Sequence, residues 1–194
     1  MMEELLALDR ALFVHINHDW ANSVFDQIFP FITDLHRNPY FFFLVFPLLV
    51  LWVWKARMAA VKWILVLTIA IGLSDGFSYR VVKAHAQRSR PVETGLSVVL
   101  RTNHHSGTSF PSNHAANMFA GATVLAFAFP AWTFLFVLIA TAVAYSRVYV
   151  GVHFPLDVTV GGLIGFFFAL VTVKFAVRWW KLPLPLREPK RKNY

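Results

Sequence analysis

Cysteine is absent from the chain, and charged residues make up only 14% of its 194 positions. Without cysteine, neither a disulfide framework nor a thiolate metal site can form. Soluble domains carry charge on roughly a quarter of their residues, so this chain has too few charges for an ordinary water-facing surface. Its hydrophobic fraction of 57% also excludes a disordered chain, a collagen and a coiled coil. The composition therefore predicts a membrane protein.

A cationic leader is also missing from the first residues. Glu3, Glu4 and Asp9 occupy the region in which a secretory signal carries positive charge, and no small-residue cleavage site follows an apolar core. Instead, apolar residues recur there at helical spacing, at Leu5, Leu8, Leu12 and Ile16. This pattern predicts an amphipathic helix over residues 1–18, which either lies at the membrane interface or packs on the rest of the protein.

Long apolar runs, by contrast, are frequent. Five of them cover residues 39–54, 61–73, 115–129, 132–145 and 156–177. The last three are each near the length that a bilayer requires at about 1.5 Å per residue. A sixth run, 24–35, is interrupted by Asp26, Pro30 and Asp34 and is interpreted as a short or tilted span. We therefore predict an all-α fold, a single membrane-embedded domain over residues 1–194 with about six transmembrane helices.

Basic residues at the ends of these runs predict the orientation. Because the spans alternate, one set of basic residues shares a side: Lys55, Arg57, Lys62, Arg178, Lys181, Arg187, Lys190, Arg191 and Lys192. The positive-inside rule makes that side cytoplasmic, with a basic tail over 179–194. Membrane flanks and an anionic substrate then account for the net charge of +8, and nucleic acid is not expected as a partner. The loop 84–110 and the turn 147–155 face the other side, which is the periplasm for a bacterial inner membrane.

Ionisable residues gather in three segments beside the spans, where such residues are costly and usually functional. The segments are 83–91, 110–114 and 146–157. The predicted topology brings all three to the outer end of the helical bundle, so their side chains can meet.

Several groups in these segments suit a phosphate. Lys83, Arg90 and Arg147 are cations, and the forked donors of arginine fit phosphate oxygens. Ser112 follows a proline and precedes an apolar run, which predicts a helix cap with unpaired backbone N–H groups beyond it. Such a helix start attracts anions. Taken singly, a cation beside a membrane span is more often an anchor for lipid headgroups than a ligand.

Two histidines and a carboxylate complete the set. His153 and Asp157 lie four residues apart across a helix start, so the carboxylate can hold one imidazole nitrogen and raise the basicity of the other. His114 supplies a second imidazole for proton transfer. Asp157 alone would suit the dipole of its helix, but the whole set indicates metal-free phosphoryl transfer. His104 and His105 look like half of a metal site, yet no carboxylate is near them in sequence, and we expect no metal there.

The three segments resemble the signature of the type 2 phosphatidic acid phosphatase superfamily. Its first part, Lys-x6-Arg-Pro, fits residues 83–91. Its third part, Ser-Arg-x5-His-x3-Asp, fits residues 146–157 without a gap. Its second part, Pro-Ser-Gly-His, fits residues 111–114 with Asn113 in place of glycine, a change that we expect to alter the local phosphate geometry but not to abolish activity. The resemblance covers residues 75–165.

This resemblance implies a six-helix bundle with a phosphate pocket at the outer membrane surface and with no metal or other cofactor. It implies that His153 is the nucleophile, that Asp157 orients it, and that His114 protonates the leaving oxygen and then activates water. The groups implied to hold the phosphoryl oxygens are Lys83, Arg90, Ser112, Arg147 and the backbone donors of Asn113 and His114. Arg88 matches a further arginine that is common in the first motif.

A site at the membrane edge favours a lipid phosphate over a soluble sugar phosphate. The resemblance places undecaprenyl pyrophosphate first, with phosphatidylglycerophosphate, phosphatidic acid and lipid A 1-phosphate as the alternatives. Because the motifs recognise only the phosphate, we expect the selectivity among lipids to depend on the loop 92–109 and on helix faces along a lateral opening. A lipid phosphotransferase and a non-enzymatic binder of anionic lipid stay open as alternatives, and the sequence does not predict the oligomeric state.

Overall fold

The structure, a computed structural model, describes residues 1–35, 39–102 and 107–184. Every regular element in these ranges is helical, which confirms the predicted all-α class. The main helices are α1 (Met2–Val14), α2 (Ser23–Asp34), α3 (Pro39–Ala56), α4 (Met58–Phe77), α6 (Asn113–Ala128), α7 (Thr133–Tyr149) and α8 (Pro155–Trp179). Helix α4 continues through a π-helical stretch (Ser78–Lys83) into the short α5 (Ala84–Ala86). Shorter helical turns occupy His15–Asp19, Pro91–Glu93 and Pro130–Trp132.

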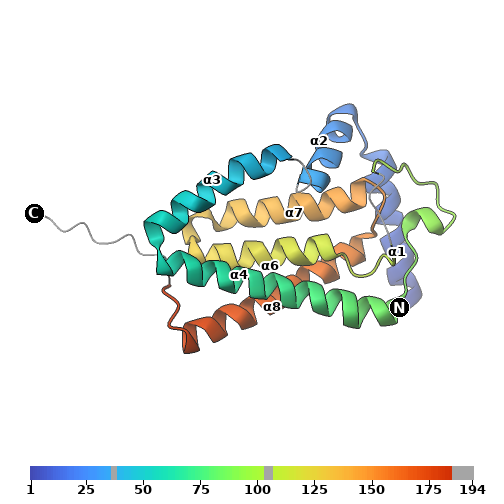
Figure 1. The fold of residues 1–194 in the computed structure, drawn as a ribbon. Helices are drawn as coiled ribbons and strands as arrows, with labels where there is room; N and C mark the ends of the chain where they lie inside the picture. Colours follow the sequence, from blue (N-terminus) through green and yellow to red (C-terminus); the bar gives the residue numbers. More distant parts are fainter. Residues whose placement is uncertain (36–38, 103–106, 185–194) are drawn as a thin grey trace, which may run out of the picture.

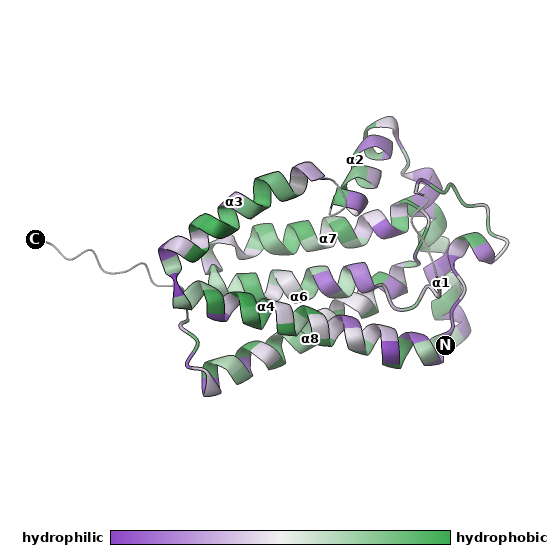
Figure 2. Ribbon diagram, in the orientation of Figure 1, coloured by the Kyte–Doolittle hydropathy of each residue, from purple (hydrophilic) through white to green (hydrophobic). Residues whose placement is uncertain are grey.

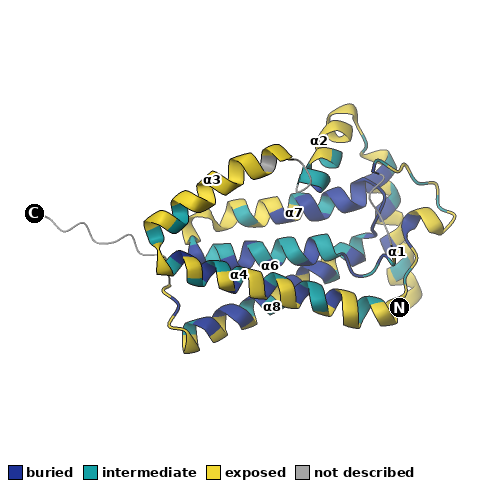
Figure 3. Cartoon of the chain, in the orientation of Figure 1, coloured by how far each residue is buried: buried dark blue, intermediate teal, exposed yellow. Residues whose placement is uncertain are grey.

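Helix α6 is the centre of the bundle. It packs against α4, α7 and α8, and these four helices run alongside one another in Figure 1. Helix α3 lies on the outside, while α1 and α2 lie at one end. Most of α6 is buried or half-buried, whereas most of α3 is exposed (Figure 3). The exposed surface of α3 is apolar (Figure 2), as is required of a helix that faces lipid.

Small residues let α8 approach α6 closely. A Cβ atom added to Gly161 would lie 2.4 Å from Ser112 O, and one added to Gly165 would lie 2.0 Å from Ala116 O. The two backbones therefore touch, as in other membrane helices that pair through small residues four positions apart. The Ser112 N–H also donates to Asp157 O at 2.9 Å. This packing fixes the start of α6 against the start of α8.

Three helical segments of the described residues are long and apolar enough to cross a membrane: Met58–Glu93, Pro130–Tyr149 and Pro155–Trp179. The apolar helix Phe42–Ala56 is shorter. Helix α6 has 16 residues and extends about 24 Å, less than a hydrocarbon core of roughly 30 Å. The protein is thus a helical membrane protein, and within its described residues three segments, not the expected six, reach the full spanning length.

Helix α2, which forms the interrupted apolar run, is too short to cross a bilayer. Its 12 residues extend about 18 Å. Near its start, Asp26 accepts a hydrogen bond from Tyr149 Oη at 2.6 Å, and at its end Asp34 accepts one from Thr102 Oγ1 at 3.2 Å. Next to Thr102, the backbone N–H of Arg101 donates to the carbonyl oxygen of Val150, which follows Tyr149. Both ends of α2 are therefore held at the end of the bundle where α7 finishes.

Helix α1 packs on the bundle through a narrow face. Asp9 and Phe13 are buried, and the rings of Phe13 and Phe154 meet with 5.3 Å between their centroids. Leu5 and Leu8 stay 44% and 65% exposed. One face of the helix therefore packs on the protein, and its leucines remain available to a membrane interface.

The outer loop and the tail both begin later than expected. The helix that starts at Met58 runs on to Ala86, so the loop begins beyond residue 84. After α8 ends, Trp180 O accepts a hydrogen bond from Lys62 Nζ at 2.9 Å, and Leu182 is buried. The first residues of the expected basic tail are thus packed against the bundle, and residues 185–194 lie outside the described part.

Candidate active site

The three polar segments meet at the end of the bundle that also carries α1. Arg90 Nη1 lies 3.4 Å from His153 Nε2, which joins the first segment to the third. The bond from Ser112 N–H to Asp157 O joins the second segment to the third. In Figure 2 this end of the molecule is rich in hydrophilic residues. Side chains far apart in the sequence are thereby brought together.

His153 lies in the tight turn between α7 and α8 and is 2% exposed. The N–H groups of Val152 and His153 both donate to Arg147 O at 3.2 Å, which fixes the turn. His153 Nδ1 lies 3.5 Å from Asp157 Oδ2, too far for a good hydrogen bond, and Nε2 faces Arg90. Burial lowers the pKa of His153 from 6.5 to about 4, and Asp157 opposes this only in part. Near neutral pH the imidazole is therefore uncharged and keeps a lone pair.

Asp157 is fully buried and accepts hydrogen bonds on both carboxylate oxygens. Oδ2 accepts from the Phe154 N–H at 2.8 Å and from Ser109 Oγ. Oδ1 accepts from Arg88 Nη1 at 2.7 Å. Asp157 is the third residue of α8, after Pro155, where an acidic side chain pairs with the exposed N–H groups of a helix start. The carboxylate is thus held by capping the helix that carries it.

Carbonyl oxygens hold Arg90 and Lys83 in place. Arg90 Nε donates to Gly107 O at 2.9 Å, and Arg90 Nη1 donates to Val152 O at 2.8 Å. Lys83 Nζ donates to Thr108 O at 3.0 Å. Because a carbonyl is a neutral acceptor, these bonds position the cations without cancelling their charge. Both side chains therefore contribute positive charge to the site.

Arg147, on the last turn of α7, is 2% exposed. Its Nη1 donates to Thr33 Oγ1 at 2.6 Å. The charges of Arg147 and Arg90 both act on His153 and help to lower its pKa. Because Thr33 belongs to α2, the short helix helps to set the position of this arginine.

The start of α6 supplies the second segment. Ser112 caps the helix, its Oγ accepting from the Ala115 N–H at 3.4 Å. The N–H groups of the first turn lack partners within the helix, and the half-buried His114 is the second residue of that turn. The side chain of Asn113 turns towards α4, where its Nδ2 donates to Asp75 Oδ1 at 2.7 Å. Asn113 can therefore offer its backbone donor to the site, while its amide ties α6 to α4.

Arg88, the further arginine of the first motif, lies behind Asp157 as seen from His153. Its Nη2 donates to Asp9 Oδ2 at 2.5 Å, and its guanidinium lies over the Phe154 ring, 4.1 Å from the centroid. The Asp157 oxygen that it binds is Oδ1, whereas Oδ2 is the oxygen beside His153. Arg88 therefore supports the carboxylate from the side away from His153.

Sequence reasoning missed four residues that hold this site through hydrogen bonds: Asp9, Thr33, Asp75 and Ser109. An acid among the leucines of an amphipathic helix was a usable signal for Asp9, and an acid inside a long apolar helix was one for Asp75. Thr33 and Ser109 carry no such signal, because hydroxyl side chains are common in helices and loops alike. His104 and His105 lie outside the described residues.

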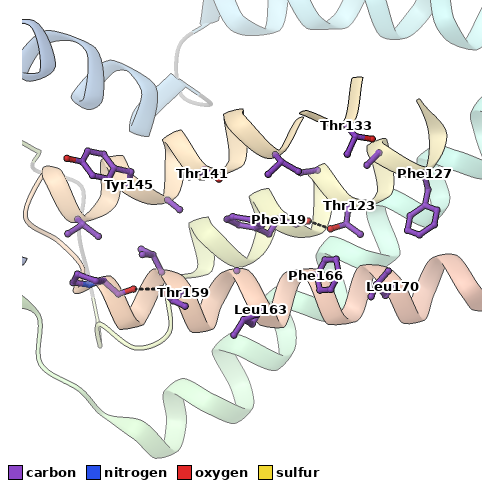
Figure 4. Close-up of a pocket in the computed structure, with 18 of the residues that line it drawn as sticks. Phe119, Thr123, Phe127, Thr133, Thr141, Tyr145, Thr159, Leu163, Phe166 and Leu170 are labelled. Atoms are coloured by element: carbon purple, nitrogen blue, oxygen red, sulfur yellow. Dashed lines mark hydrogen bonds between the residues drawn. The ribbon is translucent and has the colours of Figure 1, made fainter. Parts of the chain in front are cut away.

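An apolar cavity of about 780 Å³ opens between α6, α7 and α8. It begins beside Tyr145 and Pro155, at the end of the bundle that holds the site, and extends to Thr133 and Leu170. Figure 4 shows its walls, with Phe119 and Thr123 on α6. None of the described side chains that line it is charged. A hydrocarbon chain would fit such a cavity without stripping water from polar groups.

The sequence matches the model of the PAP2 superfamily over residues 61–181. It is 32% identical over 121 residues to an undecaprenyl-diphosphatase of Sulfolobus acidocaldarius, covering 62% of this chain and 56% of the relative. It is 30% identical over 122 residues to a lipid A 1-phosphatase of Rhizobium etli, covering 61% and 53%. The chain thus spans about half the length of these curated relatives.

The fold is also similar to a solved structure. The crystal structure of Aquifex aeolicus LpxE superposes with a TM-score of 0.70 and 31% sequence identity. The superposition covers 86% of this chain and 95% of that one. The arrangement of helices is therefore one that an experimentally determined structure shares.

Proposed function

The chain belongs to the PAP2 superfamily, and from this premise we propose that it is a membrane lipid phosphatase that uses His153 as a covalent nucleophile. The observation that carries the proposal is the setting of His153, buried and uncharged, with Nε2 towards Arg90 and Nδ1 beside Asp157. A phosphate held by Arg90 would present its phosphorus to the lone pair of Nε2. A protein that only binds anionic lipid has no need of a buried nucleophile with an orienting carboxylate.

In the first step, the Nε2 lone pair attacks phosphorus and the bond from phosphorus to the leaving oxygen breaks. His114 donates a proton to that oxygen. The imidazole of His153 becomes positively charged as the N–P bond forms, and Asp157 stabilises that charge from Nδ1. Lys83, Arg90, Arg147 and the first-turn donors of α6 bind the phosphoryl oxygens.

In the second step, His114 takes a proton from water as the water oxygen attacks phosphorus. The N–P bond breaks, its electrons return to Nε2, and inorganic phosphate leaves. His114 thus begins the next cycle protonated, and His153 begins it neutral. The two imidazoles keep their roles because one is buried within the turn and the other lies half-buried at a helix start.

The uncharged cavity supports a lipid as the substrate, because its walls lead away from the site along the bundle. We place undecaprenyl pyrophosphate first, since a relative at 32% identity is named for that activity. Lipid A 1-phosphate is the second candidate, because a relative at 30% identity is named a lipid A 1-phosphatase. Phosphatidylglycerophosphate and phosphatidic acid complete the set. The site chemistry is common to all of them.

The proposed setting is a bacterial inner membrane with the site facing the periplasm. Lys55 and Lys62 lie near the turn between α3 and α4, at the opposite end of the bundle from the site (Figure 1). Lys181 follows α8 at that same end. By the positive-inside rule this end is cytoplasmic. We place α3 and α6 across the bilayer with the three longer segments, which makes five crossings and leaves α1 and α2 at the outer surface.

Phosphate release by the purified protein in detergent tests this function. The lipid panel contains undecaprenyl pyrophosphate, lipid A, phosphatidylglycerophosphate and phosphatidic acid. We expect release that is lost in His153→Ala and retained in His85→Ala, a matched histidine change at an exposed position. Transfer of the labelled phosphoryl group to a second lipid would indicate a phosphotransferase. Binding without release in the wild type would indicate a lipid-binding protein and would contradict the proposal.

A further inference from the structure

Helix α1 contributes a buried carboxylate, Asp9, beside Arg88 and the start of α8. Asp9 is 3% exposed, and its Oδ2 accepts from Arg88 Nη2 at 2.5 Å. Its Oδ1 accepts from the Leu156 N–H at 2.8 Å, in the first turn of α8. Asp9 therefore contacts both the arginine that binds Asp157 and the backbone of the helix that carries Asp157.

Arg88 is held between two carboxylates. One end of its guanidinium binds Asp157 Oδ1 at 2.7 Å, the other end binds Asp9, and the Phe154 ring lies against its face. Such forked contacts fix the orientation of a guanidinium. The chain of contacts runs from Asp9 through Arg88 and Asp157 to His153.

The charge of this group depends on Asp9. With Asp9 ionised, the two carboxylates and Arg88 carry a net charge of −1, so negative charge remains beside His153. Without Asp9, the pair of Arg88 and Asp157 is neutral as a whole. An imidazole that gains positive charge during phosphoryl transfer is stabilised by the first arrangement and much less by the second.

We propose that Asp9 is a positioning residue of the phosphatase, which offsets the charge of Arg88 and so leaves the charge of Asp157 available to His153. This inference rests on the proposed function, since it assigns Asp9 a part in the same reaction. Asp9 touches neither the substrate nor the phosphate-binding cations. Its effect passes through Arg88 and Asp157 to the nucleophile.

The same contacts would exist if Asp9 only anchored α1, and a charge-restoring pair of substitutions separates the two roles. Asp9→Asn leaves a neutral Arg88–Asp157 pair, and Arg88→Gln leaves two buried carboxylates without their shared cation. The double variant Asp9→Asn, Arg88→Gln restores the net charge of −1 on Asp157 alone. Replacing the buried Asp9–Arg88 pair by neutral residues is also less disruptive than removing one partner of it.

The experiment measures kcat, KM and thermal midpoint for the wild type, both single variants, the double variant and Glu3→Gln. Glu3 is an exposed acid on the same helix and serves as the matched control. We expect Asp9→Asn to lower kcat by roughly ten- to a hundredfold, the range seen when groups behind a metal-bound imidazole are removed. KM should change little, because the phosphate cradle is intact. The double variant should be faster than either single variant.

Three outcomes decide the matter. Unchanged kcat in Asp9→Asn, with the wild type active, would overturn the inference. Losses that multiply in the double variant would also overturn it and would assign Asp9 to anchoring alone. If Asp9→Asn does not fold, the double variant is compared with the wild type, because only the charge effect predicts that a variant lacking both Asp9 and Arg88 keeps most of the kcat. A wild type without His153-dependent release would instead contradict the proposed function itself.

Discussion

At His153, burial and the carboxylate of Asp157 act in opposite directions on the charge of the imidazole. Burial, Arg90 and Arg147 disfavour a proton on its imidazole, while Asp157 favours one. Burial dominates, so the free site holds an uncharged ring whose pKa is about 4. Bound phosphate would add negative charge beside the ring and support the positive charge that develops during transfer. The site would therefore stabilise a positively charged imidazole in the transition state, although it disfavours one in the empty protein.

The depressed pKa predicts a pH-dependent stability. Between pH 6.5 and about 4 the unfolded chain protonates this histidine while the folded chain does not, so stability falls as pH falls through this window. Above pH 6.5 the histidine is uncharged in both states, so the stability lost at lower pH is fully present there. We expect the thermal midpoint of His153→Gln to depend less steeply on pH in this window than that of the wild type. Equal slopes would show that His153 titrates alike in both states.

At the scale of helices, close contact between α6 and α8 sets the geometry of the site. Gly161 faces the backbone of Ser112, whose N–H donates to Asp157 O. Because Gly161 has no side chain, the start of α6, with its proposed phosphate donors, lies close to the proposed nucleophile His153 and to Asp157. A single methyl group at this point would push the two halves of the site apart.

We therefore expect Gly161→Ala to destabilise the protein by about 1–3 kcal/mol, as overpacking generally does, and to lower phosphate release. The cause is the 2.4 Å approach of the new Cβ to Ser112 O. Gly72→Ala on α4 is the control, because an added Cβ there meets nothing within 4 Å. Thermal midpoints and rates of both variants test this. Similar behaviour of the two alanine variants would show that the contact is not limiting.

The sequence predicted the apolar helices and the residues of the three motifs, because hydrophobic runs and fixed spacings are local properties. It did not predict that α2 stays at one end, since the bonds from Asp26 to Tyr149 and from Asp34 to Thr102 join distant segments. Nor did it predict the place of Arg88, which follows from its pairing with Asp9 on α1. Long-range polar pairs of this kind leave no periodic pattern.

The cavity between α6, α7 and α8 predicts that the lipid chain and the phosphate headgroup are recognised by different parts of the protein. Thr141 lines the cavity on α7, whereas Leu135 is exposed on the same helix and does not line it. We expect Thr141→Trp to slow hydrolysis of long-chain lipid phosphates while a short soluble phosphate ester is hydrolysed at an unchanged rate. Leu135→Trp should affect neither substrate. Equal slowing of both substrates by Thr141→Trp would place the lipid chain elsewhere.

For the whole molecule, the absence of cysteine makes the orientation directly measurable. Ser97 is exposed in the loop at the site end, and Ala131 is exposed in the turn between α6 and α7 at the other end. With the site in the periplasm, an impermeant thiol reagent should label Ser97→Cys in intact cells. It should label Ala131→Cys only after lysis. The reverse pattern would place the site in the cytoplasm.

The proposed mechanism depends on a covalent bond between phosphorus and one nitrogen atom, Nε2 of His153. The most direct test is to quench the reaction of a lipid with a ³²P-labelled terminal phosphate in alkali, in which phosphohistidine survives, and to locate the label by peptide mapping. We predict label on His153 in the wild type and none in His153→Ala. Steady release of phosphate by the wild type with no label on His153, or with label on another residue, would contradict the account.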